Sequence, residues 1–169
     1  MSGNGRTRRL VLYALMVALA LIFSYVETLL PLPFFVPGMK LGLANIVTVI
    51  ALYKMKARDA AVISAARILL ASLLFGNMFS LAYSLAGGAL SFFVMALVKK
   101  IGRNGVVGVS VAGGVCHNIA QIGVAAALLE TAELVYYLPT LIVSGTVTGC
   151  AVGLLCAIII KKLSGFRLG

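Results

Sequence analysis

The sequence predicts an all-α integral membrane bundle of six transmembrane helices with both termini in the cytoplasm. The first observation behind this prediction is composition: 62% of the residues are hydrophobic, 11% are charged, and the mean hydropathy is +1.13. A soluble domain of this size needs a charged surface that such a chain cannot supply. The second is a series of apolar stretches long enough for membrane spans, and the third is the placing of basic residues between them.

The apolar stretches predict the spans in chain order as residues 10–30, 39–53, 60–75, 78–98, 106–129 and 134–160. The second and third are short for a full crossing, so we expect one or both to be tilted, broken or partly covered by loops. The spans form one domain over residues 10–162, between cytoplasmic tails at 1–9 and 163–169. They leave no room for a soluble catalytic domain.

Basic residues follow every second connection between these spans. Of the 14 Lys and Arg residues, the clustered ones are Arg6, Arg8, Arg9, Lys54, Lys56, Arg58, Lys99, Lys100, Arg103, Lys161, Lys162 and Arg167. The acidic Glu130 and Glu133 lie on the opposite side. Because cytoplasmic loops carry an excess of Lys and Arg, this pattern predicts that both termini are cytoplasmic. It also accounts for the net charge of +10 without a nucleic-acid surface.

The cysteines and the N-terminus give no sign of a metal site or a secretory signal. Cys116, Cys150 and Cys156 lie in apolar spans, are odd in number and match no metal-ligand spacing. We therefore expect them to be buried small residues, and we expect no metal or cofactor. The first span lacks a clear small-residue cleavage site and leads into further spans, so we do not expect it to be cleaved.

Residues 31–38 form the one connection that is not tight. Three prolines exclude a regular helix, and Phe34 and Phe35 make the segment too apolar for a simple solvated loop. Two interpretations stay open: a loop packed on the helix ends, or a lid over an outward-facing pocket.

Small residues recur at the four-residue spacing that lets transmembrane helices approach closely. Ala14 and Ala18 form one such pair in the first span, and Gly145, Gly149 and Gly153 form a longer series in the last. We expect the glycine series to serve internal packing.

Three charged residues within or beside the spans are candidates for a binding site. Glu27 ends the first span and Lys40 opens the second, so either could simply reach the membrane surface. Arg67 lies near the middle of the third span, where a guanidinium needs a cavity or a partner such as Glu27. Two cations for one carboxylate leave a positive charge that favours an anionic ligand, such as a carboxylate or phosphate.

The fifth span carries a polar stripe at its midpoint. His117 and Gln121 share a helix face beside Asn118, with Gly114 one turn before. The stripe suits either the wall of a polar cavity or hydrogen bonds that hold the helices together. Further polar candidates are Asn45 and Thr48 in the second span and Asn77 at the outer turn after the third.

Several catalytic signatures are missing. Asp59, which we expect to cap a helix on the inner side, is the single aspartate, so no aspartate pair can hold magnesium on a diphosphate. The sequence has no Walker A loop and no serine nucleophile motif. We therefore do not expect an enzyme.

The run PGMKLGLANI at 37–46, which follows the Ala14/Ala18 helix, resembles the family named heptaprenyl diphosphate synthase component I, also called the Gx transporter family. His117, Asn118 and Gln121 fit the same family, and the resemblance covers about residues 8–162. That family is similar to the substrate-binding S components of energy-coupling factor (ECF) transporters.

The resemblance implies an S component that binds a small vitamin-like molecule from outside and docks on a transmembrane T subunit driven by two cytoplasmic ATPases. It maps the T-subunit contact to Ala14 and Ala18, and the substrate to the outer side beneath residues 31–38. Two other functions stay open: an accessory subunit of polyprenyl diphosphate synthesis, and a self-contained homo-oligomeric transporter.

Overall fold

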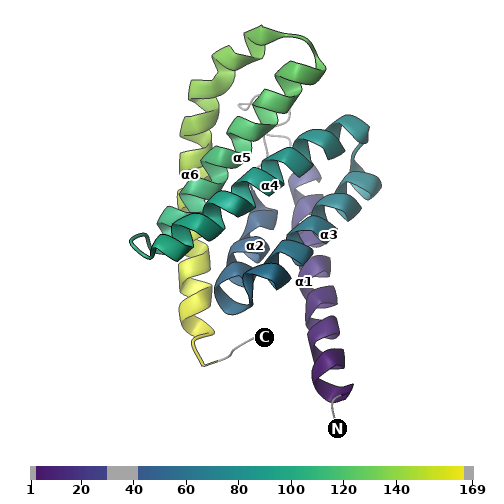
Figure 1. Cartoon of the computed structure of the whole chain (residues 1–169), viewed down its shortest axis with the longest axis vertical. Helices are drawn as coiled ribbons and strands as arrows, with labels where there is room; N and C mark the ends of the chain where they lie inside the picture. The colour runs from purple at the N-terminus through teal and green to yellow at the C-terminus, as the bar shows by residue number, and fades with distance from the viewer. Residues whose placement is uncertain (1–2, 30–41, 166–169) are drawn as a thin grey trace.

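The computed structural model describes residues 3–29 and 42–165, and these residues form six α-helices, one short 3-10 helix and the turns between them (Figure 1). In chain order they are α1 (Gly3–Leu29), α2 (Leu43–Lys54), α3 (Ala57–Phe75), α4 (Met78–Ile101), α5 (Val106–Leu128), the 3-10 helix η1 (Ala132–Tyr137) and α6 (Leu138–Lys162). The all-helical class predicted from the sequence is confirmed. Segment 31–38 and Lys40 lie outside the described residues.

Helix α2 lies inside the bundle, in contact with α1, α3 and α6. Residues 46–52 are all buried, so every face of this part of the helix is covered by its neighbours. Val47, Val49, Ala51 and Leu52 have at most 1% of their surface exposed. At about 1.5 Å per residue, its 12 residues span roughly 18 Å, less than the roughly 30 Å of a bilayer core. Lys54, at the C-terminal end of α2, binds the carbonyl oxygen of Leu163 just after α6, so the first turn of α2 lies further inside the bundle.

The other helices pack around α2 in a chain of neighbours, in which α1 contacts α3, α3 contacts α4, α4 contacts α5 and α5 contacts α6. The α5–α6 contact depends on glycine. A Cβ added to Gly114 would lie 2.7 Å from the carbonyl oxygen of Gly145, and one added to Gly149 would lie 2.7 Å from the Cα of Val111. The prediction that the α6 glycines serve internal packing is confirmed.

Four helical segments are long and apolar enough to cross a membrane: Arg6–Leu29, Met78–Ile101, Val106–Leu128 and Ala132–Lys162. Helix α3 is not among them, because its 19 residues include the charged Arg58, Asp59 and Arg67. The chain is thus a multi-pass membrane protein. The two spans that the sequence marked as short correspond to the two helices outside this group.

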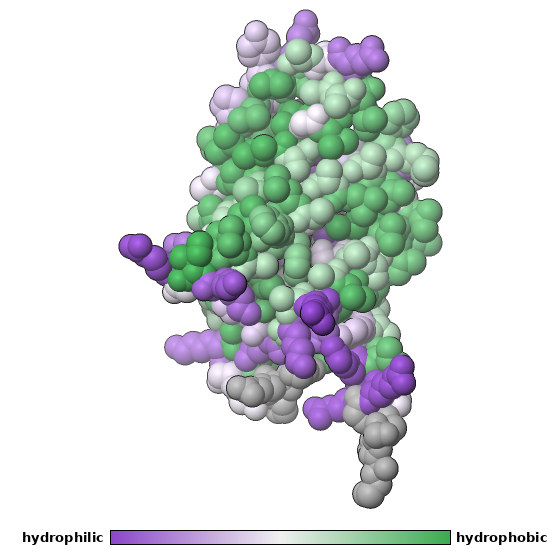
Figure 2. Space-filling model, viewed as in Figure 1, coloured by the Kyte–Doolittle hydropathy of each residue, from purple (hydrophilic) through white to green (hydrophobic). Residues whose placement is uncertain are grey.

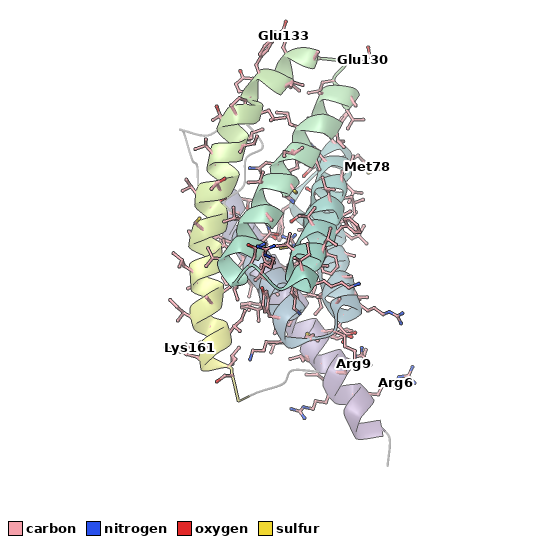
Figure 3. All side chains as sticks on the ribbon, turned by 60° about the vertical axis from the view of Figure 1, so that its left-hand side comes forward. Arg6, Arg9, Met78, Glu130, Glu133 and Lys161 are labelled. Atoms are coloured by element: carbon pink, nitrogen blue, oxygen red, sulfur yellow. The ribbon has the colours of Figure 1, made fainter. Side chains whose placement is uncertain are left out.

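On the face shown in Figure 2, hydrophobic residues cover the middle, and hydrophilic residues gather toward the ends. Figure 3 places Arg6, Arg9 and Lys161 at one end, and Glu130 and Glu133 at the other. The basic and acidic ends are therefore separated along the long axis of the bundle.

Basic side chains at the first of these ends hold helix termini together. Lys99 of α4 donates to the carbonyl oxygen of Leu52, in the last turn of α2, and Lys54 donates to the carbonyl oxygen of Leu163 at 2.6 Å. Cations at the C-terminal end of a helix satisfy carbonyl groups that lack an intrahelical partner.

Asp59 does not cap a helix as expected. The residue before α3 is Lys56, which makes no side-chain cap, and Asp59 lies inside the first turn. Its carboxylate is buried and pairs with the guanidinium of Arg9 on α1. Asp59 pairs with Arg9 and does not cap α3, because the Arg9 charge reaches this carboxylate from the neighbouring helix. An acidic residue is also favourable in the first turn of a helix.

Among the cysteines, Cys156 is fully buried, as predicted. Cys116 and Cys150 are only half-buried, which differs from the expectation. Both lie on the long apolar helices α5 and α6, which turn part of their surface away from the bundle.

Candidate binding site

A cavity of about 40 Å³ lies where the start of α2 meets α1, α3, α5 and α6. Its described lining contains charged, polar and small residues, namely Glu27, Gly42, Asn45, Arg67, Gly114, His117, Asn118 and Thr148. Five of the eight residues predicted to bind a substrate thus meet at one place, from four helices.

The first turn of α2 forms one boundary of the cavity. Gly42 has φ 76°, a left-handed conformation that glycine adopts most readily, and it starts the helix. The backbone N–H of Leu43 donates to Oε1 of Glu27 at 2.7 Å, so the end of α1 satisfies a free donor of α2. Asn45 lies in the same turn and lines the cavity. This end of a helix carries partial positive charge.

Arg67 reaches the cavity from the middle of α3. Its Nε atom is buried and has no hydrogen-bond partner among the described residues. The Glu27 carboxylate attracts the guanidinium electrostatically, as the sequence suggested for a structural pair. Buried donors without a protein partner are rare in native proteins, and such a donor commonly binds a water, an ion or a ligand.

Helix α5 supplies another wall of the cavity, formed by Gly114, His117 and Asn118. Asn118 is buried, and its Nδ2 donates to the carbonyl oxygen of Leu141 on α6 at 2.9 Å. This bond fixes the side chain and leaves the amide oxygen as an acceptor. Asn118 therefore has both of the roles considered for the polar stripe: it holds α5 and α6 together by a hydrogen bond, and it lines the cavity.

Gln121 lies outside this lining, although it shares a helix face with His117. Both side chains pack against Gly87 of α4, where an added Cβ would lie 2.8 Å from Cγ of Gln121 and 3.0 Å from Cε1 of His117. The Nε2 of Gln121 is buried and has no hydrogen-bond partner in the described part of the chain. The polar stripe of α5 therefore faces the cavity at Asn118, and packs against α4 at Gln121 and in part at His117.

Asn77 is also outside the cavity lining. Its side chain accepts a hydrogen bond from the backbone N–H of Ser80 at 2.8 Å and so caps the start of α4. Capping is a common role for an asparagine before a helix, and it explains the presence of Asn77 here without any role in ligand binding.

Three lining residues, Gly42, Gly114 and Thr148, were not among the predicted binding residues, although Gly114 was marked beside the polar stripe. Gly42 stands inside the PGMKLGLANI run, and Thr148 precedes Gly149 of the glycine series, so both lie beside features that the sequence did mark. The hydroxyl of Thr148 donates to the carbonyl oxygen of Ser144 at 2.9 Å, which leaves it to act as an acceptor toward the cavity.

A second, smaller space of about 20 Å³ continues from this cavity. Gly42, Asn45, Gly114 and Thr148 line both spaces. The additional residues of the second space are Val49, Met95, Ser110, Gly149 and Val152. The site therefore has a charged and polar part and a largely apolar part.

Ala14 and Ala18 lie on the outward face of α1, exposed between Leu15 and Leu19, which are 64% and 40% exposed. No described helix covers this face, since α1 contacts α2 and α3 through its other side. The face is open to lipid or to another protein.

The sequence profile of the family described as heptaprenyl diphosphate synthase component I matches residues 16–159. The chain belongs to this family. The resemblance inferred from the PGMKLGLANI run is thereby confirmed. No curated protein matches the chain, and no solved structure matches it.

Proposed function

We propose that this family member is the membrane-embedded substrate-binding component of an ECF-type uptake transporter and not an enzyme. The observation that carries the proposal is the cavity, where a guanidinium with a buried Nε, two asparagine side chains, a histidine and the start of a helix converge within an apolar bundle. Ionisable groups are costly inside a membrane and commonly mark a ligand or ion site.

The chemistry of the cavity supports a small polar ligand with an anionic group. Arg67 offers a planar set of donors that matches a carboxylate or phosphate, and its buried Nε has no partner among the described residues. The positive end of α2 adds to the attraction. Lys40, which lies outside the described residues, stays a predicted second cation of this site, and Gln121 stays a predicted binding residue beside it.

The proposal requires the site to open. A water molecule needs roughly 10–15 Å³ of such space, so a cavity of about 40 Å³ holds a few waters, whereas ligand pockets usually measure about 300–1,000 Å³. A vitamin-sized molecule would therefore enter only if helices or side chains at the cavity move apart, as happens in many proteins that enclose their ligands.

The partners follow from the same proposal. The exposed Ala14/Ala18 face of α1 would dock on a transmembrane T subunit, because small residues let two helices approach closely in lipid. Two cytoplasmic ATPases would supply the energy. The basic end of the bundle, which carries Arg6 and Lys161, would face the cytoplasm of the cell membrane.

A second candidate is an accessory subunit of polyprenyl diphosphate synthesis, and it is favoured by the description of the matching family as a synthase component. A membrane subunit of that kind would hold the lipid product for a separate soluble enzyme. The chain has a single aspartate, so it would not itself bind the magnesium diphosphate.

Purification of the full chain from its native membrane, with a tag at the C-terminus, separates the two candidates. The transporter proposal expects a T subunit and two ATPases in the complex, and ATP-dependent uptake when the complex is placed in liposomes. Recovery of an aspartate-rich soluble synthase, with no ATPase and no uptake, would contradict it and favour the second candidate.

A further inference from the structure

The smaller space lies one helical turn away from the cavity, as the residues that line each of them show. From Asn45 to Val49 on α2, from Thr148 to Val152 on α6, and from Gly114 back to Ser110 on α5, the lining shifts by one helical turn. Each step is about 5–6 Å, and α5 runs opposite to α2 and α6. All three steps therefore lead in one direction, from the charged cavity toward the basic end of the bundle.

The residues change character over this single turn. Arg67, Glu27, His117 and Asn118 line only the first space, whereas Val49, Met95 and Val152 line only the second. These three apolar side chains are at most 7% exposed. Ser110 is the one polar side chain among the described residues that line only the second space, and Asn45 and Thr148 lie at its boundary with the first. A water in the second space would therefore bind at Ser110 or at this boundary. Beside Val49, Met95 and Val152, a methylene chain gains dispersion contacts that a water does not.

The second space is also narrow. Its volume is about 20 Å³. A Cβ on Gly149 would lie 2.7 Å from the Cα of Val111, so the α5 and α6 backbones already touch beside the space. A branched or cyclic group would have to separate the two helices further than an unbranched chain would.

We propose that the site takes an amphipathic anion, with a carboxylate or phosphate head at Arg67 and a slim unbranched apolar portion that reaches between α2, α5 and α6 toward Met95. This inference rests on the proposed anion site and specifies its ligand class. The head is selected by charge, and the length of the chain is selected by the apolar space below it.

The test uses the full chain in lipid nanodiscs, with straight-chain carboxylates (acetate, butyrate, hexanoate) and the matching alkyl phosphates as probes. Binding is measured by equilibrium dialysis against empty nanodiscs, which corrects for partition into lipid. Each methylene that enters the apolar space should raise the affinity about fourfold until the space is full. The carboxylate and phosphate series show which head the site prefers.

The Val49→Ile/Val152→Ile double variant fills the apolar space and should reduce the ratio of hexanoate to acetate affinity toward one. Val143→Ile is the matched control, since Val143 lies on the same helix as Val152 and is 63% exposed. It should leave the ratio unchanged. If the double variant does not fold, Ser110→Cys tests the same point, because hexanoate should protect this thiol from a maleimide better than acetate does.

Two failures are distinguishable. If short anions bind but affinity does not depend on chain length, or hexanoate gives no added protection at position 110, the apolar extension is wrong and the anion site stands. If no carboxylate or phosphate binds above the empty nanodisc, the proposed anion site itself is wrong, and the extension with it.

Discussion

The carboxylate of Glu27 accepts a hydrogen bond from the backbone N–H of Leu43 at 2.7 Å, and so joins the end of α1 to the first turn of α2. The two residues are 16 positions apart and lie on either side of the intervening segment 30–41. Because Glu27 also lines the cavity and attracts Arg67, one side chain links the placing of a helix to the charge balance of the site.

Replacing Glu27 should separate these two effects. Glu27→Gln keeps an oxygen that can accept from Leu43 but removes the negative charge, whereas Glu27→Leu removes both. The loss of the acceptor should cost about 1–3 kcal/mol of stability in Glu27→Leu and much less in Glu27→Gln. Thermal unfolding in detergent measures the difference. Equal losses in the two variants would mean that the charge, and not the hydrogen bond, holds the helices.

The close contact of α5 and α6 predicts a sharp contrast between two glycines of one helix. Gly114→Ala would push a methyl group against the carbonyl oxygen of Gly145, and should destabilise the protein by about 1–3 kcal/mol. Gly123 has nothing within 4 Å of an added Cβ, so Gly123→Ala should be neutral or stabilising by up to about 1 kcal/mol. Thermal stability of both variants should be compared. A stable Gly114→Ala protein would contradict the packing described.

Asp59 predicts a loss of stability in acid. A hydrogen bond from the Tyr13 hydroxyl, and then the hydrogen bond and charge of Arg9, hold the pKa of this carboxyl below its ordinary value. A lowered pKa in the folded state contributes stability at pH values above the ordinary pKa of about 3.9, and the contribution disappears as the pH falls through the folded value.

Unfolding measured between about pH 6 and pH 2 should therefore show stability falling below about pH 4. Tyr13→Phe should flatten this dependence, and Asp59→Asn should flatten it further. Because the Arg9 side chain is 48% exposed, solvent screens its part of the effect. An unchanged acid profile in Asp59→Asn would show that other groups cause the loss.

The exposed α1 face predicts a partner-specific defect. Ala18→Trp should prevent association with a T subunit, because a bulky ring holds the two helix backbones apart. Folding and ligand retention should persist, since Ala18 faces outward. Val147→Trp on α6, where the native side chain is 64% exposed, is the matched control and should keep the complex. Co-purification measures both, and survival of the complex in Ala18→Trp would move the interface elsewhere.

The sequence predicted the helical membrane fold well, because hydropathy and charge distribution are properties of single segments. It also marked the two short spans. It could not show that α2 is enclosed by α1, α3 and α6, because the order of helices in a bundle depends on contacts between distant residues. The ion pair of Asp59 and Arg9, 50 positions apart, was missed for the same reason.

The sequence marked the polar residues that converge on the cavity, because such residues are costly in a membrane, but it could not show which neighbour each helix face packs against. Arg67, His117 and Asn45 were marked as polar groups in apolar spans, and they meet in one cavity. Gln121 shares a helix face with His117, but helical spacing alone does not show that Gly87 of α4 packs against that face.

Native mass spectrometry tests most directly whether Arg67 holds an anionic ligand, on which the proposed function depends. Wild-type protein purified from its native membrane should carry an additional bound mass, Arg67→Lys should carry less of it, and Arg67→Met should carry none while unfolding at a similar temperature. This order is expected because lysine keeps the charge and loses the two-pronged geometry. Equal retention of the same mass by Arg67→Met and wild type would contradict the anion site at Arg67.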